Sequence, residues 1–176
     1  QWWAHTQEIG QTMEIFQIAL ILATFLCSLV AGFLFAFAIV VMPGISNLND
    51  REFIRAFQVI DRVIQNNQPV FALVWIGSVV TLVASAVPGI WQLDGVERLL
   101  MIFAALVYLL GVQLPTAIIN VPLNNQLQTV NVDAMNETTQ RAARNDFEPR
   151  WNRWNIIRTL FASLASVLLI TLLFIL

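Results

Sequence analysis

The sequence predicts an all-α fold: a polytopic four-helix bundle in a membrane, with an amphipathic surface helix between the first and second spans. The composition and four long apolar segments predict it. Hydrophobic residues make up 58% of the chain and charged residues only 11%, whereas soluble domains carry about 25% charged residues. So few charges cannot cover the apolar surface of a 176-residue soluble domain, and a lipid environment removes that need.

Four apolar segments are long enough to cross the hydrocarbon core of a bilayer, which takes about 20 residues. The predicted spans are about 15–42, 69–90, 99–119 and 156–176. None has a charge in its central part, and Pro43-Gly44 is expected to stop the first. We therefore divide the chain into an N-terminal extension, residues 1–12, and a four-transmembrane-helix domain, residues 13–176.

The arginines indicate the orientation. Eight of the nine flank the two long polar segments, and only Arg98 lies on the opposite side of the membrane. Because basic residues concentrate in cytoplasmic loops, we expect the long loops in the cytoplasm and both termini on the other side. The expected location is a bacterial inner membrane, either cytoplasmic or thylakoid.

Small residues recur every four positions in the first two spans, a spacing that lets helix backbones approach closely in lipid. We expect both rows to be packing seams. The rows are Ser28, Gly32 and Ala36 in the first span and Gly77, Thr81, Ser85 and Gly89 in the second.

The segment after the first span has the pattern of an amphipathic helix. Asn49 followed by Glu52 resembles a capping box. Apolar residues then recur at helical spacing, with arginines opposite, so the helix is expected to lie on the membrane or cap the bundle. The apolar stripe is Phe53, Phe57, Ile60 and Ile64. By contrast, residues 126–146 are polar and lack periodicity, and we expect a mobile loop there.

Two groups of polar and aromatic residues lie at the cytoplasmic mouth of the predicted bundle. After Pro115, which should kink the third span, one helical face carries amides that need partners near hydrocarbon. These are Gln113, Asn120 and Asn124. At the start of the fourth span, one stripe contains Trp151, Trp154, Asn155 and Arg158.

Arg158 is the deepest charge, and placing it within a span costs about 3 kcal/mol. We expect it to bond with Asp61, Asn120, Asn124 or the carbonyls freed near the prolines. Asp61 lies beside the apolar stripe of the surface helix and can pair with Arg158 or Arg153. Simpler interpretations remain: an interfacial aromatic and arginine belt, amides that end a helix, and a solvated surface acid.

The scarcity of metal ligands limits the chemistry. Cys27 is the only cysteine and His5 the only histidine. Sites built from several Cys or His ligands, such as structural zinc or iron–sulfur clusters, cannot be made from this chain alone. We predict no metal and no cofactor. No nucleic-acid partner is expected either, because the arginines form no basic stripe.

Several short motifs occur in a familiar order around the four spans. They are Val41-Met42-Pro43-Gly44, Phe57-Gln58, Ile64-Gln65-Asn66, Asn120-Val121-Pro122-Leu123-Asn124, and Trp151 with Trp154-Asn155 and Arg158. In these residues the chain resembles the anthrone oxygenase-like integral membrane family (domain of unknown function 1772), from about Ile18 to the C-terminus.

The resemblance implies a four-helix membrane fold and, for a few polyketide-pathway members, oxidation of anthrones to anthraquinones by O₂ without a recognised cofactor. Such a reaction needs an apolar slot, a base and donors for a developing oxyanion. The candidate catalytic residues are Asp61 as the base, with Arg158 and Asn155 as donors. The candidate substrate-binding residues are Asn120, Asn124, Gln113, Trp151 and Trp154, the tryptophans by stacking on the rings.

The alternative is a non-enzymatic accessory subunit or lipid-binding scaffold of a larger membrane complex; a transporter fits less well, because inverted repeats and midplane charges are lacking. The expected partners are membrane lipid, a lipophilic small molecule, and a homo-oligomer or larger membrane complex. A closed cavity with a polar end would favour an enzyme or binder, and a solid core the subunit.

Overall fold

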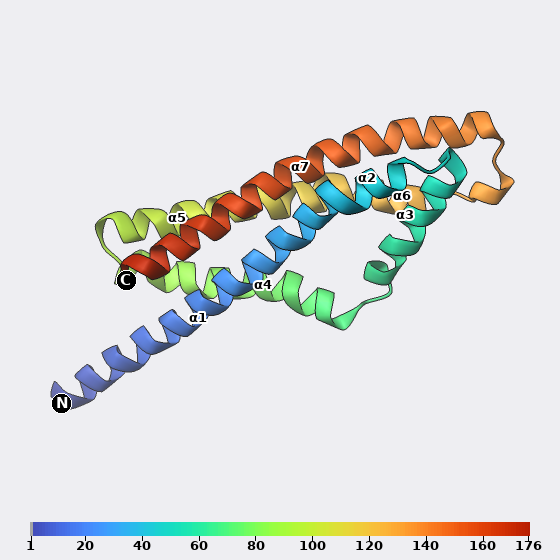
Figure 1. The fold of residues 1–176 in the computed structure, drawn as a ribbon. Helices are drawn as coiled ribbons and strands as arrows, with labels where there is room; N and C mark the ends of the chain where they lie inside the picture. Colours follow the sequence, from blue (N-terminus) through green and yellow to red (C-terminus); the bar gives the residue numbers. More distant parts are fainter. Residues whose placement is uncertain (1) are drawn as a thin grey trace.

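The structure is a computed structural model that describes the backbone of residues 2–176 and the side chains from Glu14 onward, so the N-terminal extension predicted for residues 1–12 lies outside the described side chains. Within residues 2–176 every regular element is helical (Figure 1). The elements are α1 (Trp2–Ala36), the π-helical turn η1 (Phe37–Val41), α2 (Met42–Ser46), α3 (Asp50–Gln65), α4 (Pro69–Gln92), α5 (Gly95–Tyr108), the π-helical turns η2 (Leu109–Gln113) and η3 (Thr116–Asn120), α6 (Val121–Gln128), the 3₁₀ turn η4 (Val132–Ala134) and α7 (Glu137–Ile175).

The predicted all-α fold with four membrane-spanning helices is confirmed. Four continuous helical stretches are long and apolar enough to cross a bilayer: Glu14–Ser46, Pro69–Gln92, Gly95–Gln128 and Glu137–Ile175. The prediction that Pro43-Gly44 ends the first span is wrong, because the helix continues through both to Ser46. Pro43 directly follows a π-helical turn, in which the Met42 backbone N–H bonds to the Phe37 carbonyl.

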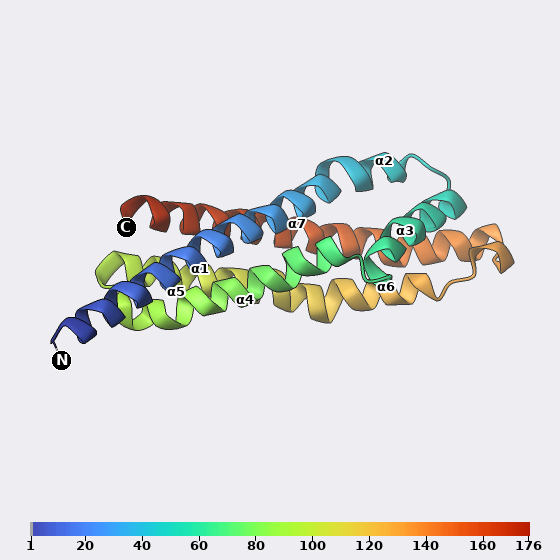
Figure 2. The ribbon, with the colours of Figure 1, turned by 90° about the horizontal axis from the view of Figure 1, so that it is seen from below.

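The four long helices form a closed ring. α1 packs on α4 and α7, and α5 packs on the same two helices. Figures 1 and 2 place both chain termini at one end of the bundle and α3 at the other. The core inside the ring consists of fully buried side chains, among them Phe16, Leu20, Leu34, Leu82, Met101, Tyr108 and Leu169.

α3 caps the end of the bundle away from the termini. The predicted start is confirmed, because the Asn49 side chain accepts a hydrogen bond from the Glu52 backbone N–H at 2.9 Å. Phe53 and Phe57 are buried against α7, whereas Ile60 and Ile64, predicted in the same stripe, are only half-buried. Each buried aromatic side chain contributes about 1.5–3 kcal/mol, so packing on α7 holds the cap.

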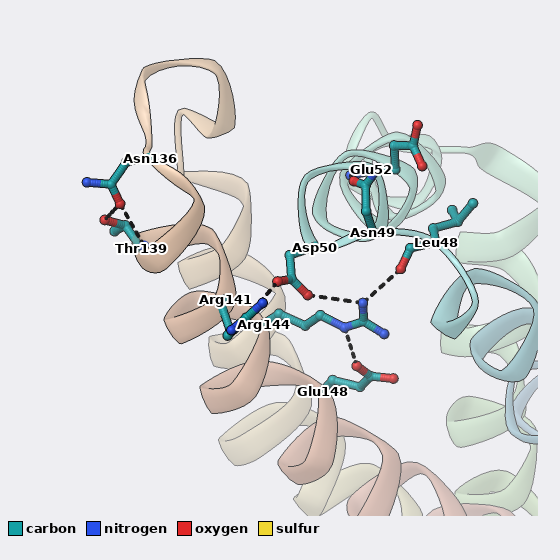
Figure 3. A network of polar contacts seen from close by, with 9 residues as sticks. All are labelled: Leu48, Asn49, Asp50, Glu52, Asn136, Thr139, Arg141, Arg144 and Glu148. Carbon is teal, nitrogen blue, oxygen red and sulfur yellow. Dashed lines mark hydrogen bonds and ion pairs between the residues drawn. The ribbon is translucent and has the colours of Figure 1, made fainter.

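A polar network around Arg144 ties this cap to α7 (Figure 3). Its guanidinium donates to Glu148 at 2.6 Å, to Asp50 at 3.2 Å and to the Leu48 carbonyl at 2.9 Å. It also lies over the Phe53 ring, 4.4 Å from the centroid. One arginine therefore joins the end of α2, the start of α3 and the start of α7.

The prediction of a mobile loop over residues 126–146 is wrong for most of that segment. α6 continues to Gln128 and α7 begins at Glu137, where the Asn136 side chain accepts hydrogen bonds from the backbone N–H and the hydroxyl of Thr139. Only residues 129–136 remain outside these helices, and they contain η4.

Two interactions hold this connection against α3. Gln58 donates to the carbonyls of Leu127 and Val130, at 2.8 and 2.9 Å. On the surface, the Arg51 guanidinium donates to Asp133 and, together with Arg55, lowers the pKa of that carboxyl group below its ordinary value. The connection is therefore tied down by side chains that the sequence places far away.

Of the two predicted packing seams, the first does not form. Gly32 is exposed, and a methyl group built on it would have no neighbour within 4 Å. In the second row, Gly77 lies against Leu26 of α1, and Gly89 lies against Phe16 and Met101. A closer approach occurs at Gly111, where a Cβ atom would lie 2.4 Å from Cγ of Phe161.

Gly111→Ala is therefore expected to destabilise the bundle by about 1–3 kcal/mol, the usual cost of overpacking. Its matched control, Gly32→Ala, should leave the free energy of unfolding unchanged or higher, because its methyl group meets open space. Cys27 is the only cysteine and is buried, so a thiol-reactive dye reports thermal unfolding. Equal melting temperatures for the two variants would contradict the close approach of the third and fourth spans.

Candidate active site

A cavity of about 220 Å³ lies inside the bundle, directly under α3. Its walls come from all four spans and from α3, so it forms only when the cap is in place. The lining side chains are Phe33, Leu34, Phe37, Phe57, Asp61, Ile64, Phe71, Trp75, Thr116, Asn120, Val121, Asn124, Trp151, Asn155 and Arg158. The cavity is smaller than typical small-molecule sites, which measure about 300–1,000 Å³.

The apolar walls are largely aromatic. Phe71 stacks on Trp75, with 5.4 Å between ring centroids and 21° between planes, and meets Phe33 edge to face at 5.3 Å. Trp75 donates its indole N–H to Gln113 at 3.0 Å. Gln113, predicted to bind substrate, does not line the cavity and instead orients a tryptophan that does.

A buried carboxylate forms one polar corner. Asp61 is 3% exposed and accepts three amide hydrogen bonds, from Asn124 at 2.8 Å, Gln65 at 2.7 Å and Gln128 at 2.9 Å. Asn124 in turn accepts from the Trp151 indole N–H at 2.8 Å. An ionised carboxylate accepts hydrogen bonds only, so three donors suit that form. The interpretation of Asp61 as a solvated surface acid is therefore wrong.

A buried guanidinium forms the second polar corner. Arg158 is 4% exposed and donates to the Thr116 hydroxyl at 2.9 Å and to the Asn155 carbonyl oxygen at 3.0 Å. The Asn155 side chain is itself fixed, since it donates to the Leu34 backbone carbonyl at 3.1 Å. The guanidinium carbon also lies 5.8 Å from the Trp151 ring centroid.

Arg158 points inward as expected, but the prediction of its partners is wrong, because it bonds to Thr116 and Asn155. Among the described residues, neither Arg158 nor Arg153 forms an ion pair with Asp61. Amide donors already occupy the Asp61 oxygens, and Arg153 lies exposed on another side of α7. The guanidinium and the carboxylate therefore line one cavity without a direct contact.

Asn120 is the unusual residue of the site. Its side chain is 2% exposed and lines the cavity, yet neither its amide nitrogen nor its carbonyl oxygen has a hydrogen-bond partner among the described residues. An unpartnered buried polar group costs about 1–3 kcal/mol. Arg158 likewise has an unpartnered Nε. An acceptor oxygen on a ligand would take hydrogen bonds from the Asn120 amide nitrogen and the Arg158 Nε, both of which are donors.

Helical irregularities surround the cavity. The turns η2 and η3 flank Pro115, and η1 follows the Phe33–Leu34 wall. In each turn a backbone N–H reaches the carbonyl five residues back, as from Val121 to Thr116. The structure thus has π-helical turns on both sides of Pro115, where the sequence predicts a kink, and such turns frequently occur at functional sites.

The structure separates the two predicted tryptophans. Trp151 is buried in the cavity wall, whereas Trp154 is half-buried and does not line the cavity. Sequence reasoning missed Phe33, Phe71, Trp75 and Thr116 as lining residues. Thr116 could have been predicted, since its spacing of i+3 from Gln113 and i−4 from Asn120 places it on the same helical face. The aromatic residues could not, because such residues are common in membrane spans.

The family comparison covers most of this site. A family model described as anthrone oxygenase matches residues 57–168. The chain belongs to the anthrone oxygenase family. The matched range contains every polar side chain that lines the cavity, from Asp61 to Arg158. No curated protein and no solved structure matches the chain.

Proposed function

We propose that this member of the anthrone oxygenase family oxidises a lipophilic aromatic carbon acid of the anthrone type with O₂, in the cavity under α3. The observation that carries the proposal is one partly enclosed space with aromatic walls, a buried carboxylate, and a buried amide and guanidinium that have unpartnered atoms. The walls suit a flat ring system, and the polar groups suit a ketone oxygen that becomes negatively charged.

In this proposal Asp61 removes one proton from the methylene carbon opposite the ketone. The resulting enolate carries its charge on the ketone oxygen, where Asn120 and Arg158 donate hydrogen bonds. The enolate carbon transfers electrons to O₂ and forms a C–O bond, and protonation by Asp61 gives a hydroperoxide.

The second half of the reaction restores the carboxylate. Asp61 removes the remaining proton from the same carbon, the O–O bond breaks, and the departing hydroxide takes this proton from Asp61 to form water. The CH₂ group and O₂ become a C=O group and H₂O, so the substrate supplies all the electrons. The charge develops on an oxygen in a water-poor site, where positioned donors stabilise it most.

The test is turnover by the purified chain in lipid nanodiscs. With anthrone as the probe, we expect formation of anthraquinone and consumption of one O₂ per product at a rate well above spontaneous oxidation. Heat-denatured protein in identical nanodiscs supplies the background. Binding of anthrone without faster oxidation would instead support the non-enzymatic lipophile-binding alternative, and the absence of both would reject the proposal.

We also propose that the α3 end of the bundle faces the cytoplasm, because eight of nine arginines flank its connections. A cysteine replacing Asn131 should then be protected from a membrane-impermeant thiol reagent in intact cells, whereas one replacing Asp94 should react. Both positions are exposed, and the native Cys27 is buried. The reverse labelling pattern would overturn this orientation.

A further inference from the structure

A second hollow lies beside the cavity, on the outside of the bundle. We call it the lateral groove; its volume is about 430 Å³. It runs between α1, α3 and α4, and its lining is apolar except for one glutamine. The lining residues are Phe33, Phe37, Val59, Ile60, Val63, Ile64, Gln68 and Phe71.

The lateral groove and the cavity share a wall. Phe33, Phe37, Ile64 and Phe71 line both spaces. These side chains therefore lie between the two spaces. The edge-to-face contact of Phe33 and Phe71, 5.3 Å between centroids, is part of this partition. The Phe33 and Phe71 side chains can move to another rotamer without any change in secondary structure.

The helices on the two sides of the lateral groove are loosely joined. α3 packs on α7, α6, α2 and η4, and α4 is not among the elements on which it packs extensively. Residues 66–68 connect the two helices, with Asn67 in the left-handed region at φ 57°. The Gln68 side chain accepts a hydrogen bond from the backbone N–H of Phe71 and fixes the start of α4. A small separation of α3 from α4 would open the cavity sideways.

The lateral groove opens at the level where amphipathic aromatic molecules collect. Its outer rim is Val59 and Val63 on α3, which are 59% and 57% exposed. The exposed Arg62 lies between them in sequence, and the apolar span α4 begins just after, at Pro69. This change from charged to apolar marks the membrane interface, where rings with a polar end concentrate.

We propose that the lateral groove is the doorway through which a lipophilic aromatic ketone dissolved in the bilayer reaches the cavity, with Phe33 and Phe71 as its gate. The inference rests on the proposed function for the identity of the ligand. It does not require turnover, because a path for a ligand can be measured by binding rates.

Val63→Trp tests the doorway, since it fills the lateral groove without lining the cavity. The probe is anthraquinone delivered from vesicles, followed by quenching of tryptophan fluorescence in stopped flow. We expect association and dissociation to slow together by tenfold or more, with Kd within about twofold of wild type. The matched control is Val80→Trp on the exposed face of α4, 59% exposed and lining neither space. Equal rates in the two variants would overturn the proposal.

A second measurement needs no ligand. Photo-crosslinking p-benzoylphenylalanine at Phe71 in nanodiscs should capture phospholipid chains, because the doorway connects this position with the bilayer. Phe103, 53% exposed on the outer surface, should also capture lipid, and Phe16, 1% exposed in the core, should not. A lipid-free result at Phe71 alongside labelling at Phe103 would show that the doorway is closed. Turnover of anthrone together with that result would leave the proposed function intact and reject the doorway alone.

Discussion

Asp61→Asn should reduce kcat for anthrone oxidation by about 10²–10⁴-fold, the usual contribution of a positioned general base. The amide cannot accept the proton that the carboxylate takes from the carbon acid. The side chain keeps its shape, and its one remaining oxygen can accept from Gln65 and Gln128, while its new amide nitrogen takes the place of the oxygen that accepts from Asn124. Anthrone oxidation in nanodiscs, followed by the absorbance of the product, measures the effect.

Asp133→Asn is the matched control for this variant. Asp133 pairs with Arg51 and Arg55 on the surface and does not line the cavity. It undergoes the same change of group and should keep the wild-type rate. If Asp61→Asn remained folded and turned over at the wild-type rate, Asp61 would not be the base.

Arg158→Leu should lower kcat/KM by about 10²–10³-fold, the usual effect of removing one donor from a developing oxyanion. Its net effect on stability should be modest, because removing a buried charge that has no ionic partner relieves a desolvation cost and offsets the about 1–3 kcal/mol lost when the buried Asn155 oxygen loses its donor. Among the described residues, its hydrogen bonds go to neutral groups, Thr116 and Asn155. Activity and melting temperature, measured on one preparation, separate the two effects.

Arg153→Leu removes the same charge from an exposed position five residues away on α7. Its kcat/KM and its melting temperature should both stay close to the wild-type values. A large loss of stability in Arg158→Leu, with binding of anthraquinone unchanged, would mean that Arg158 serves the packing of the bundle rather than its ligand.

Much of this arrangement follows from local sequence. The four spans follow from uninterrupted apolar length, and the start of α3 follows from Asn49 and Glu52. Arg158 is predicted to point inward because a charge one turn inside a span is costly. Each of these conclusions depends on a few neighbouring residues and the solvent around them.

Other features depend on long-range packing that no local pattern contains. The first turns of α7 are held by buried side chains at helical spacing among polar residues: Phe147 and Trp151 pack on α3, and Gln140 donates to the carbonyls of Val132 and Met135. The predicted Asp61–Arg158 pair does not form, because Asn124 and Gln128 on α6 donate to the Asp61 carboxylate instead. Gly32 is exposed although its spacing suits a seam, since spacing alone does not show which face of a helix meets a neighbour.

The most direct test of the cavity as the site of chemistry is a structure of the protein with anthraquinone bound in lipid nanodiscs. We expect the ring system inside the cavity, between Phe71 and Trp151. One ketone oxygen should lie within hydrogen-bonding distance, about 2.7–3.2 Å, of the Asn120 amide nitrogen or the Arg158 guanidinium. The opposite ketone should lie on the side of Asp61. Anthraquinone bound elsewhere on the bundle, with this cavity empty, would contradict the assignment of the cavity as the site of chemistry.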